Sequence, residues 1–304
     1  MEQANLDKRA TERILPILVG AGVPRLTGWG EVVSSFSRAV NARHSQGLLV
    51  SFVEETLAMT YLSVCLPALF RKPRHGLVPG NQVRFDGHRV ILGDFVVDFP
   101  GRPTWQGKLT QRDVRGFCAS RVSLVRESLL LKGRDGGFLG LLRGGEPNNP
   151  FVARAMRVLS GDRSAASRAV RLNALSGLVG LGPGSTPSGD DFIAGALLGE
   201  TALRLLWSAE SKAVADSLEP MIPWSKGKED LWIAMNRTTD AGKTLLWQAL
   251  QGHFPNYLIE TVRCVSEAKG RQEIADAVER AVVRGETSGT DALTGFLFSM
   301  EGRI

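Results

Sequence analysis

Cysteine is scarce in this chain of 304 residues, and the way it is spaced excludes two kinds of stapled fold. The three residues, Cys65, Cys118 and Cys264, lie far apart and form no C-x-x-C pair. An odd, widely spaced set predicts neither a disulfide framework nor a zinc knuckle. With 43% hydrophobic residues, the chain has enough apolar side chains for an ordinary core, and a reducing cytoplasm is the expected location.

Long hydrophobic runs and basic clusters are also lacking. The apolar stretch at residues 14–23 is too short to cross a bilayer and contains Pro16, so we expect neither a membrane span nor a signal peptide. The net charge is +6, but the basic residues are scattered and no basic run is interleaved with aromatic residues. We therefore expect no nucleic-acid binding.

Three common catalytic patterns are absent. The 4 histidines are not spaced as metal ligands, and no serine lies in a G-x-S-x-G sequence. The AGKT sequence at residues 241–244 resembles the end of a P-loop, but Arg237 occupies the position of the first glycine. The sequence therefore predicts no zinc site, no Ser-His-Asp triad and no P-loop.

The residue pattern of the chain changes near residue 105, from one typical of strands to one typical of helices. Residues 47–55, 81–87 and 88–100 are rich in Val, Ile and Phe, and QVRF-DG-HRVIL predicts a hairpin with Asp86 and Gly87 as its turn. An opening helix is predicted over residues 5–19, and helices dominate after residue 105, beginning with 118–133. We predict an α+β fold, with a β-rich unit at residues 1–105 and a mainly helical domain at 106–304.

The most unusual stretch is LVGLGPGSTPSGDDFIAG at residues 178–195, and it has an internal echo. TSGTDALTGFLF at residues 287–298 shares with it the pattern S-G-x-D-x-[IL]-[AT]-G-x-L. Ser188 with Asp191, and Ser288 with Asp291, have the spacing of a capping box, in which serine is the N-cap and the acid is the third helical residue. This structural interpretation leaves the glycine loop at residues 180–187, and Asp190, unexplained.

A glycine-rich loop that leads into a helix is a common anion cradle, but two adjacent carboxylates repel a bare phosphate. A metal-bound phosphate resolves the conflict, with Mg²⁺ as a compatible cation, and so does a ligand with N–H donors, such as an amide or carbamoyl group. No cofactor is required by the sequence. We predict that the catalytic residues are Asp190, Asp191 and Asp291. Predicted substrate contacts are Gly182, Gly184, Ser185, Thr186, Ser188, Gly189, Ser288, Gly289 and Thr290.

Two further segments are candidates for the same site. Arg237, Thr238 and Thr239 precede an apolar helical run, so one threonine is either a plain N-cap or part of a third helix start that lines the site. Asn41 lies in SFSRAVNARH at residues 35–44, which fits a strand edge, a solvated turn or a ligand-contacting turn.

These segments resemble the AllH-like family. The resemblance rests on GLGPGSTPSGDDFIAG, on RTT at residues 237–239, on SGTDALTG at residues 288–295, and on SxFSRAVN near the N-terminus. The family takes its name from a subunit of an oxamate carbamoyltransferase of allantoin catabolism. Such an enzyme interconverts carbamoyl phosphate and oxamate with oxalurate and phosphate.

The resemblance implies a subunit that works with other carbamoyltransferase subunits on a small anionic amide or carbamoyl substrate. A carbamoyl group would offer N–H donors to Asp190 and Asp191. Two alternatives stay open on the sequence: a non-catalytic ligand-binding or assembly subunit, and a hydrolase that uses a metal bound by the three aspartates.

Overall fold

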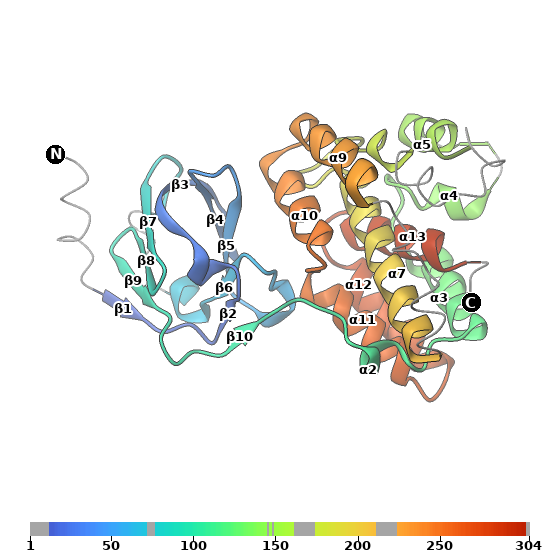
Figure 1. The fold of residues 1–304 in the computed structure, drawn as a ribbon, viewed down its shortest axis with the longest axis horizontal. Coiled ribbons are helices and arrows are strands. Elements are labelled where there is room, and N and C mark those ends of the chain that lie inside the picture. The colour runs from blue at the N-terminus through green and yellow to red at the C-terminus, as the bar shows by residue number, and fades with distance from the viewer. Residues whose placement is uncertain are drawn as a thin grey trace. The chain divides into compact units, whose positions relative to one another are not determined.

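The computed structural model describes residues 12–71, 77–144, 146–147, 149–160, 174–210 and 224–301. It confirms the predicted α+β class, because strands fill the first part of the chain and helices the rest (Figure 1). Two compact units are formed. Unit 1 comprises residues 1–107 with 255–257, and unit 2 comprises residues 108–254 with 258–304.

Unit 1 is built on one curled sheet of ten short strands, coloured blue to blue-green in Figure 1. The strands lie in the order β1-β9-β8-β7-β3-β4-β5-β6-β2-β10. They are β1 (Glu12–Ile14), β2 (Leu18–Gly20), β3 (Thr27–Ser35), β4 (Ala39–His44), β5 (Leu49–Val53), β6 (Ser63–Cys65), β7 (Gln82–Asp86), β8 (Arg89–Leu92), β9 (Phe95–Asp98) and β10 (Thr104–Trp105).

The predicted hairpin is confirmed, but its turn is shifted by one residue. Strands β7 and β8 pair antiparallel with Phe85 opposite Val90, so Gly87 and His88 connect the strand ends. Gly87 has a φ of +82°, which a glycine adopts without strain. The Asp86 side chain accepts hydrogen bonds from the backbone N–H groups of His88 (3.1 Å) and Arg89 (2.9 Å), so Asp86 ends β7 instead of forming the turn.

The predicted opening helix over residues 5–19 is wrong in its described part. Residues 5–11 lie outside the described residues, and residues 12–14 and 18–20 form strands β1 and β2. Ile14 pairs with Val97, and Val19 pairs with Val64. Pro16 between the two strands cannot donate a helical hydrogen bond, and the sheet supplies backbone partners that a short helix would lack.

Unit 2 is helical. Its helices are α2 (Gln111–Val114), α3 (Ala119–Lys132), α4 (Gly140–Arg143), α5 (Pro150–Ser160), α7 (Ser188–Glu210), α9 (Trp224–Ala234), α10 (Asp240–Leu250), α11 (Asn256–Glu267), α12 (Arg271–Val282) and α13 (Ser288–Met300). The helix predicted over residues 118–133 is α3. The sequence SRAVRLNALSGLVG at residues 167–180 also has apolar residues at helical spacing; its residues 167–173 lie outside the described residues, and residues 174–176 are helical.

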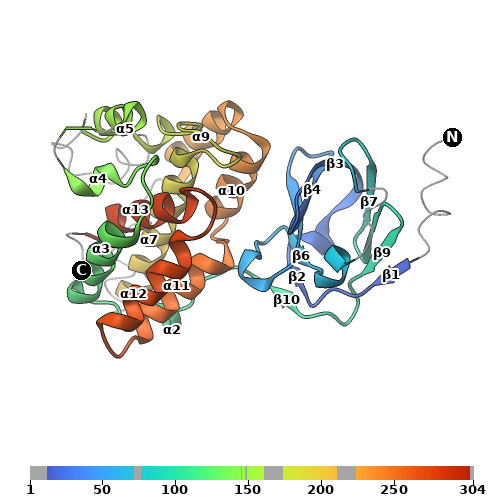
Figure 2. The ribbon, with the colours of Figure 1, turned by 180° about the vertical axis from the view of Figure 1, so that it is seen from behind.

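Helices α7 and α13 form the centre of unit 2, and the contact between them is the most extensive between any two elements. Figures 1 and 2 show α7 in yellow with α13 against it and α3, α10 and α12 around them. Every residue of α7 from Ser188 to Gly199 is buried, as are residues 289–297 of α13. A helix that is buried on all sides needs neighbours on all sides, which explains why these two sequences lack a polar face.

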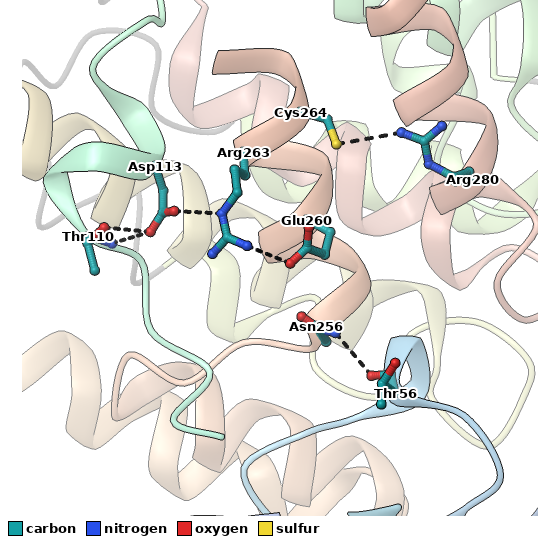
Figure 3. Close-up of polar contacts among 8 residues, drawn as sticks. All are labelled: Thr56, Thr110, Asp113, Asn256, Glu260, Arg263, Cys264 and Arg280. Carbon is teal, nitrogen blue, oxygen red and sulfur yellow. Dashed lines mark hydrogen bonds and ion pairs between the residues drawn. The ribbon is translucent and has the colours of Figure 1, made fainter. Parts of the chain in front are cut away.

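A polar network fastens α2 to α11 beside this centre (Figure 3). The backbone N–H of Thr110 donates to Asp113 in a capping box (2.8 Å), and the Arg263 guanidinium donates to the other Asp113 oxygen (2.9 Å). Arg263 also reaches Glu260 (2.7 Å). Burial would raise the pKa of the Asp113 carboxyl, but its bonds to Thr110 and Arg263 outweigh burial and lower that pKa.

The first residue of α11 makes its own contact within unit 1. The Asn256 side chain donates to the carbonyl of Thr56 (3.0 Å; Figure 3). Among the helices of the described segments, none combines the length and the apolar character needed to span a bilayer.

Candidate functional site

The two copies of the sequence echo are the starts of α7 and α13, and they meet in a reciprocal way. A Cβ atom added to Gly195 would lie 1.8 Å from the carbonyl oxygen of Ala292. A Cβ atom added to Gly295 would lie 1.9 Å from the carbonyl oxygen of Phe192. Because equivalent positions of the two copies touch each other, the helix starts are related by a local twofold arrangement.

The predicted capping boxes are wrong. Ser188 and Ser288 are the first residues of their helices, not N-caps. The Asp191 N–H bonds the carbonyl of Pro187 (3.2 Å), and the Asp291 N–H bonds that of Thr287 (2.9 Å), so each acid is the fourth helical residue. A capping box requires the acid at the third helical position, so the predicted pattern is out of register by one residue.

Each aspartate instead faces the hydroxyl of the other copy. The Asp191 carboxyl lies against Ser288 of the other copy and against Thr186 of its own loop. The Asp291 carboxyl lies against Ser188 of the other copy and against Thr287, the N-cap of its own helix. The hydroxyls of Thr186 and Ser288 are 3.1 Å apart. We call these five residues the acid junction: Thr186, Ser188, Asp191, Ser288 and Asp291.

The acid junction is shielded from solvent. Asp191 is 3% exposed, and Asp291 is 0% exposed. Burial raises the pKa of Asp191 well above its ordinary value, and the negative charge of Asp291 adds to this. Burial also raises the pKa of Asp291, although the backbone N–H of Phe138 donates to it at 2.6 Å and opposes the rise.

Three buried oxygens of the acid junction have no hydrogen-bond partner in the described part of the chain. They are Oδ2 of Asp191, Oδ2 of Asp291 and Oγ of Ser188. The Ser188 hydroxyl is close enough to Asp291 to favour its charged form, but it completes no hydrogen bond of good geometry. Buried polar atoms without partners are uncommon and call for a proton, a water molecule or a ligand group.

Asp190 has a different role from its neighbour, because both of its oxygens are used by the chain. Oδ1 accepts the backbone N–H of Gly180 (2.9 Å), and Oδ2 accepts the hydroxyl of Thr238. A Cβ atom on Gly242 would lie 2.0 Å from Oδ2, so only glycine there leaves room for the carboxyl. Asp190 thus connects the glycine loop and the start of α10 to α7.

The start of α10 does join the α7 start, as one of the two interpretations of RTT predicted. Thr239 is its N-cap and accepts the N–H of Gly242 (3.0 Å). The Thr239 hydroxyl also donates to the carbonyl of Ser185 in the glycine loop. Thr239 therefore both caps α10 and contacts the glycine loop.

The glycine loop at residues 180–187 leads into α7 and supplies Thr186 to the acid junction. Gly180, Gly182 and Gly184 have φ values of +74°, +110° and +102°, a region that other residues rarely adopt. Gly184 and Ser185 are exposed, whereas Thr186 is half-buried. Gly189 and Gly289 lie elsewhere in the packing, since a Cβ atom on either would be 1.9 Å from a carbonyl oxygen, of Leu178 and Ala281 respectively.

One contributing segment was missed by the sequence analysis. Residues 134–138 bring backbone N–H donors to α13: Arg134 donates to Thr290 (3.0 Å), and Phe138 donates to Asp291. Gly137 permits this approach, because its Cβ would lie 2.2 Å from Asp291 Oδ1. The glycine pair at residues 136–137 was the available signal, but nothing in the sequence connects it to a residue so distant along the chain.

Two residues predicted to contact the substrate, Arg237 and Asn41, have hydrogen-bond partners other than the three acids. The Arg237 guanidinium is exposed and donates to the carbonyl of Ser176 (2.7 Å), and in the described segments it forms no ion pair with Asp190, Asp191 or Asp291. Asn41 belongs to unit 1, where it is part of the interior strand β4 and donates to Ser34 (2.9 Å). Across the segments that are described, no group of three or more His, Cys, Asp or Glu side chains is arranged to hold a metal ion.

Removing the Asp190 carboxyl should free the glycine loop. Asp190→Ala leaves the Gly180 N–H and the Thr238 hydroxyl without their acceptor, and we expect a loss of about 2 kcal/mol of stability. Asp190→Asn keeps an oxygen for Gly180 and should cost about half as much. Urea unfolding measures both, and hydrogen exchange at Gly180 should quicken only in the alanine variant. Equal stability of the alanine variant and the wild type would contradict the role of Asp190.

Comparison with known proteins supports the resemblance seen in the sequence. Residues 178–300 match the model of a family described as oxamate carbamoyltransferase subunit AllH. The matched segment contains both helix starts of the acid junction, the glycine loop and the start of α10. No curated protein and no solved structure matches the chain.

Proposed function

Because residues 178–300 match the model of a family described as oxamate carbamoyltransferase subunit AllH, we propose that the protein is a subunit of a carbamoyltransferase-type enzyme. The substrate we propose is oxamate, or a related small amide, with carbamoyl phosphate as the donor. The family match is the observation that carries this proposal, since it includes both helix starts of the acid junction, the glycine loop and the start of α10. Further carbamoyltransferase subunits are the proposed partners.

The proposed reaction moves a carbamoyl group between two small anions. The amide nitrogen of oxamate attacks the carbamoyl carbon, an N–C bond forms, and the C–O bond to phosphate breaks. The nitrogen gives up one proton, which a carboxylate accepts and the departing phosphate takes up. No covalent protein intermediate is needed, so the enzyme has to hold two substrates together and stabilise the charge that develops on the carbonyl oxygen.

The residues divide these tasks according to their exposure. The exposed part of the glycine loop, including Gly184 and Ser185, presents backbone to solvent, and we assign it the phosphate or the oxamate carboxylate. Exposed Arg237 is the cation proposed for the same anionic group. Asp191 and Asp291 each retain a buried oxygen without a partner, and we assign them the amide or carbamoyl group of the substrate.

A second candidate function is a ligand-binding or assembly subunit without catalysis. The observation in its favour is that both carboxyl oxygens of Asp190 accept hydrogen bonds from the chain itself, so this residue of the motif has a structural role. We do not propose the metal-dependent hydrolase, because its donor set is not assembled in the described residues.

The unpaired thiols of Cys65, Cys118 and Cys264 fit a reducing compartment, and we propose a cytoplasmic location.

Reconstitution tests the proposed function. The chain should be inactive or weakly active alone, and active in phosphorolysis of oxalurate once it is mixed with the other subunits of the enzyme. Full turnover by the partner subunits in the absence of this chain would refute the catalytic proposal. Calorimetric binding of carbamoyl phosphate or oxamate without turnover in any mixture would favour the second candidate.

A further inference from the structure

We propose that Asp191 and Asp291 share a single proton, and that the resulting pair recognises the planar amide of a primary amide or carbamoyl ligand. The shared proton rests on the unpartnered oxygens and on the charges of the acid junction. The choice of ligand rests on the proposed function.

The geometry gives the pair two matching free oxygens. Each carboxyl uses one oxygen on the protein: Asp291 Oδ1 accepts the Phe138 N–H, and Asp191 lies against the hydroxyls of Ser288 and Thr186. In each residue Oδ2 is buried without a partner, and the two carboxyls interact electrostatically. One proton held between the two Oδ2 atoms would give both of them a partner.

The charges around the junction also call for one positive charge. Two ionised carboxylates bring two negative charges, and each helix start contributes roughly half a positive charge, so about one negative charge is left over. Asp190 is the other charged group that acts on Asp191, and it increases the excess. The guanidinium of Arg134, on the adjacent segment, is occupied with the carbonyl of Gly285 (2.9 Å).

Charged side chains on the surrounding helices do not make up the difference. None of them is among the charges that act on Asp191 or Asp291. Those on the helices that pack against α7 and α13 are Arg112 and Asp113 of α2, Arg121, Arg126, Glu127 and Lys132 of α3, Asp240 and Lys243 of α10, and Arg271, Glu273, Asp276, Glu279 and Arg280 of α12.

A carboxyl pair with one proton is complementary to an amide. The protonated member donates to the ligand carbonyl, and the ionised member accepts an N–H, so both Oδ2 atoms keep a partner when the ligand replaces the shared proton bridge. Two ionised carboxylates would repel the carbonyl oxygen. Thr186 and Ser288, whose hydroxyls are 3.1 Å apart, are half-buried, whereas the other residues of the acid junction are buried, so we expect the ligand to approach the pair from their side.

Counting protons tests the first part. Asp releases its proton near pH 4 when unfolded, so a native state that keeps one proton loses stability as pH rises above that value, until the pair ionises. For each pH unit, the unfolding equilibrium constant of the wild type should increase by a factor ten times larger than the factor for Asp191→Asn or Asp291→Asn. In either variant the new amide stands in for the protonated carboxyl and leaves the other aspartate ionised.

Each other result overturns the shared proton. Equal steepness in wild type and variants means that no proton is held. If the unfolding constant of the wild type rises a hundredfold more per pH unit than that of the variant with both substitutions, the native state holds two protons. If one of the single variants rises as steeply as the wild type, the proton belongs to the aspartate that this variant keeps. Calorimetric unfolding of the wild type in two buffers of different ionisation enthalpy counts the proton directly, so the result does not depend on the variants folding.

A pair of isosteric probes tests the ligand. Oxamate and pyruvate differ only in an –NH2 group against a methyl group, and the full chain with its partner subunits should bind oxamate at least tenfold more tightly. Equal binding, or binding of neither, overturns amide recognition. Because the proton count requires no activity, it can succeed or fail independently of the carbamoyltransferase proposal.

Discussion

Gly195→Ala is expected to destabilise unit 2 by about 3 kcal/mol or more, because the added methyl group meets backbone that cannot move aside. The new Cβ would lie 1.8 Å from the carbonyl oxygen of Ala292 and 2.6 Å from its carbonyl carbon. The two helices would have to separate along their whole buried contact. Urea unfolding of the full chain, followed by circular dichroism, measures the loss.

The reciprocal contact, between Gly295 and Phe192, gives a second prediction that can be compared with the first. Gly295→Ala places its Cβ 1.9 Å from the Phe192 carbonyl oxygen, so it should cost about as much as Gly195→Ala. Gly270→Ala is the matched control, since nothing lies within 4 Å of the added Cβ, and it should cost about 1 kcal/mol or less. If the two crossing variants proved as stable as this control, the close helix contact would be refuted.

The β-rich part of the fold could be predicted because its signals are local. The alternating Val, Ile and Phe residues around Gly87 specify a hairpin within a dozen positions of sequence, and they form β7 and β8. The turn was displaced because the Asp86 side chain satisfies two backbone N–H groups, which composition does not show. The opening helix failed for a non-local reason: the partners of β1 and β2 are β9 and β6, far along the chain.

The candidate site was predicted in outline and mistaken in detail. The repeated S-G-x-D pattern correctly marks two helix starts, since both copies begin a helix. Its capping-box interpretation failed because each acid is the fourth helical residue, and each acid also meets a serine of the opposite helix, which a single local pattern cannot show. The approach of Phe138 to Asp291 joins residues 153 positions apart, a distance that no motif covers.

The structure also changes what the two adjacent acids mean. Asp190 and Asp191 look equivalent in sequence, yet one connects three segments of unit 2 and the other faces α13 with a free oxygen. Adjacent helical positions point about 100° apart, so neighbouring side chains belong to different surroundings. Asp190 therefore has a structural role and Asp191 a ligand-facing role, and substitutions of the two residues should have different effects.

Asp191→Ala and Asp291→Ala should each lower turnover of the reconstituted enzyme by about a hundredfold or more while leaving the fold largely intact. Each variant removes one of the two oxygens that we assign to the amide. That oxygen has no partner in the described residues, so we expect its removal to leave the fold largely intact. Steady-state phosphorolysis of oxalurate by the complete complex is the measurement, with circular dichroism as the check on folding.

The comparison variant is Asp276→Ala, which removes a half-buried carboxylate on α12 whose partner is Gln272 (2.7 Å). It should keep wild-type turnover. The loss in the two junction variants should appear in kcat more than in KM, because the pair is assigned to the group that reacts, whereas the glycine loop is assigned to binding the anion. Full turnover in either junction variant would show that the acid junction is architectural and that the chemistry lies elsewhere in the complex.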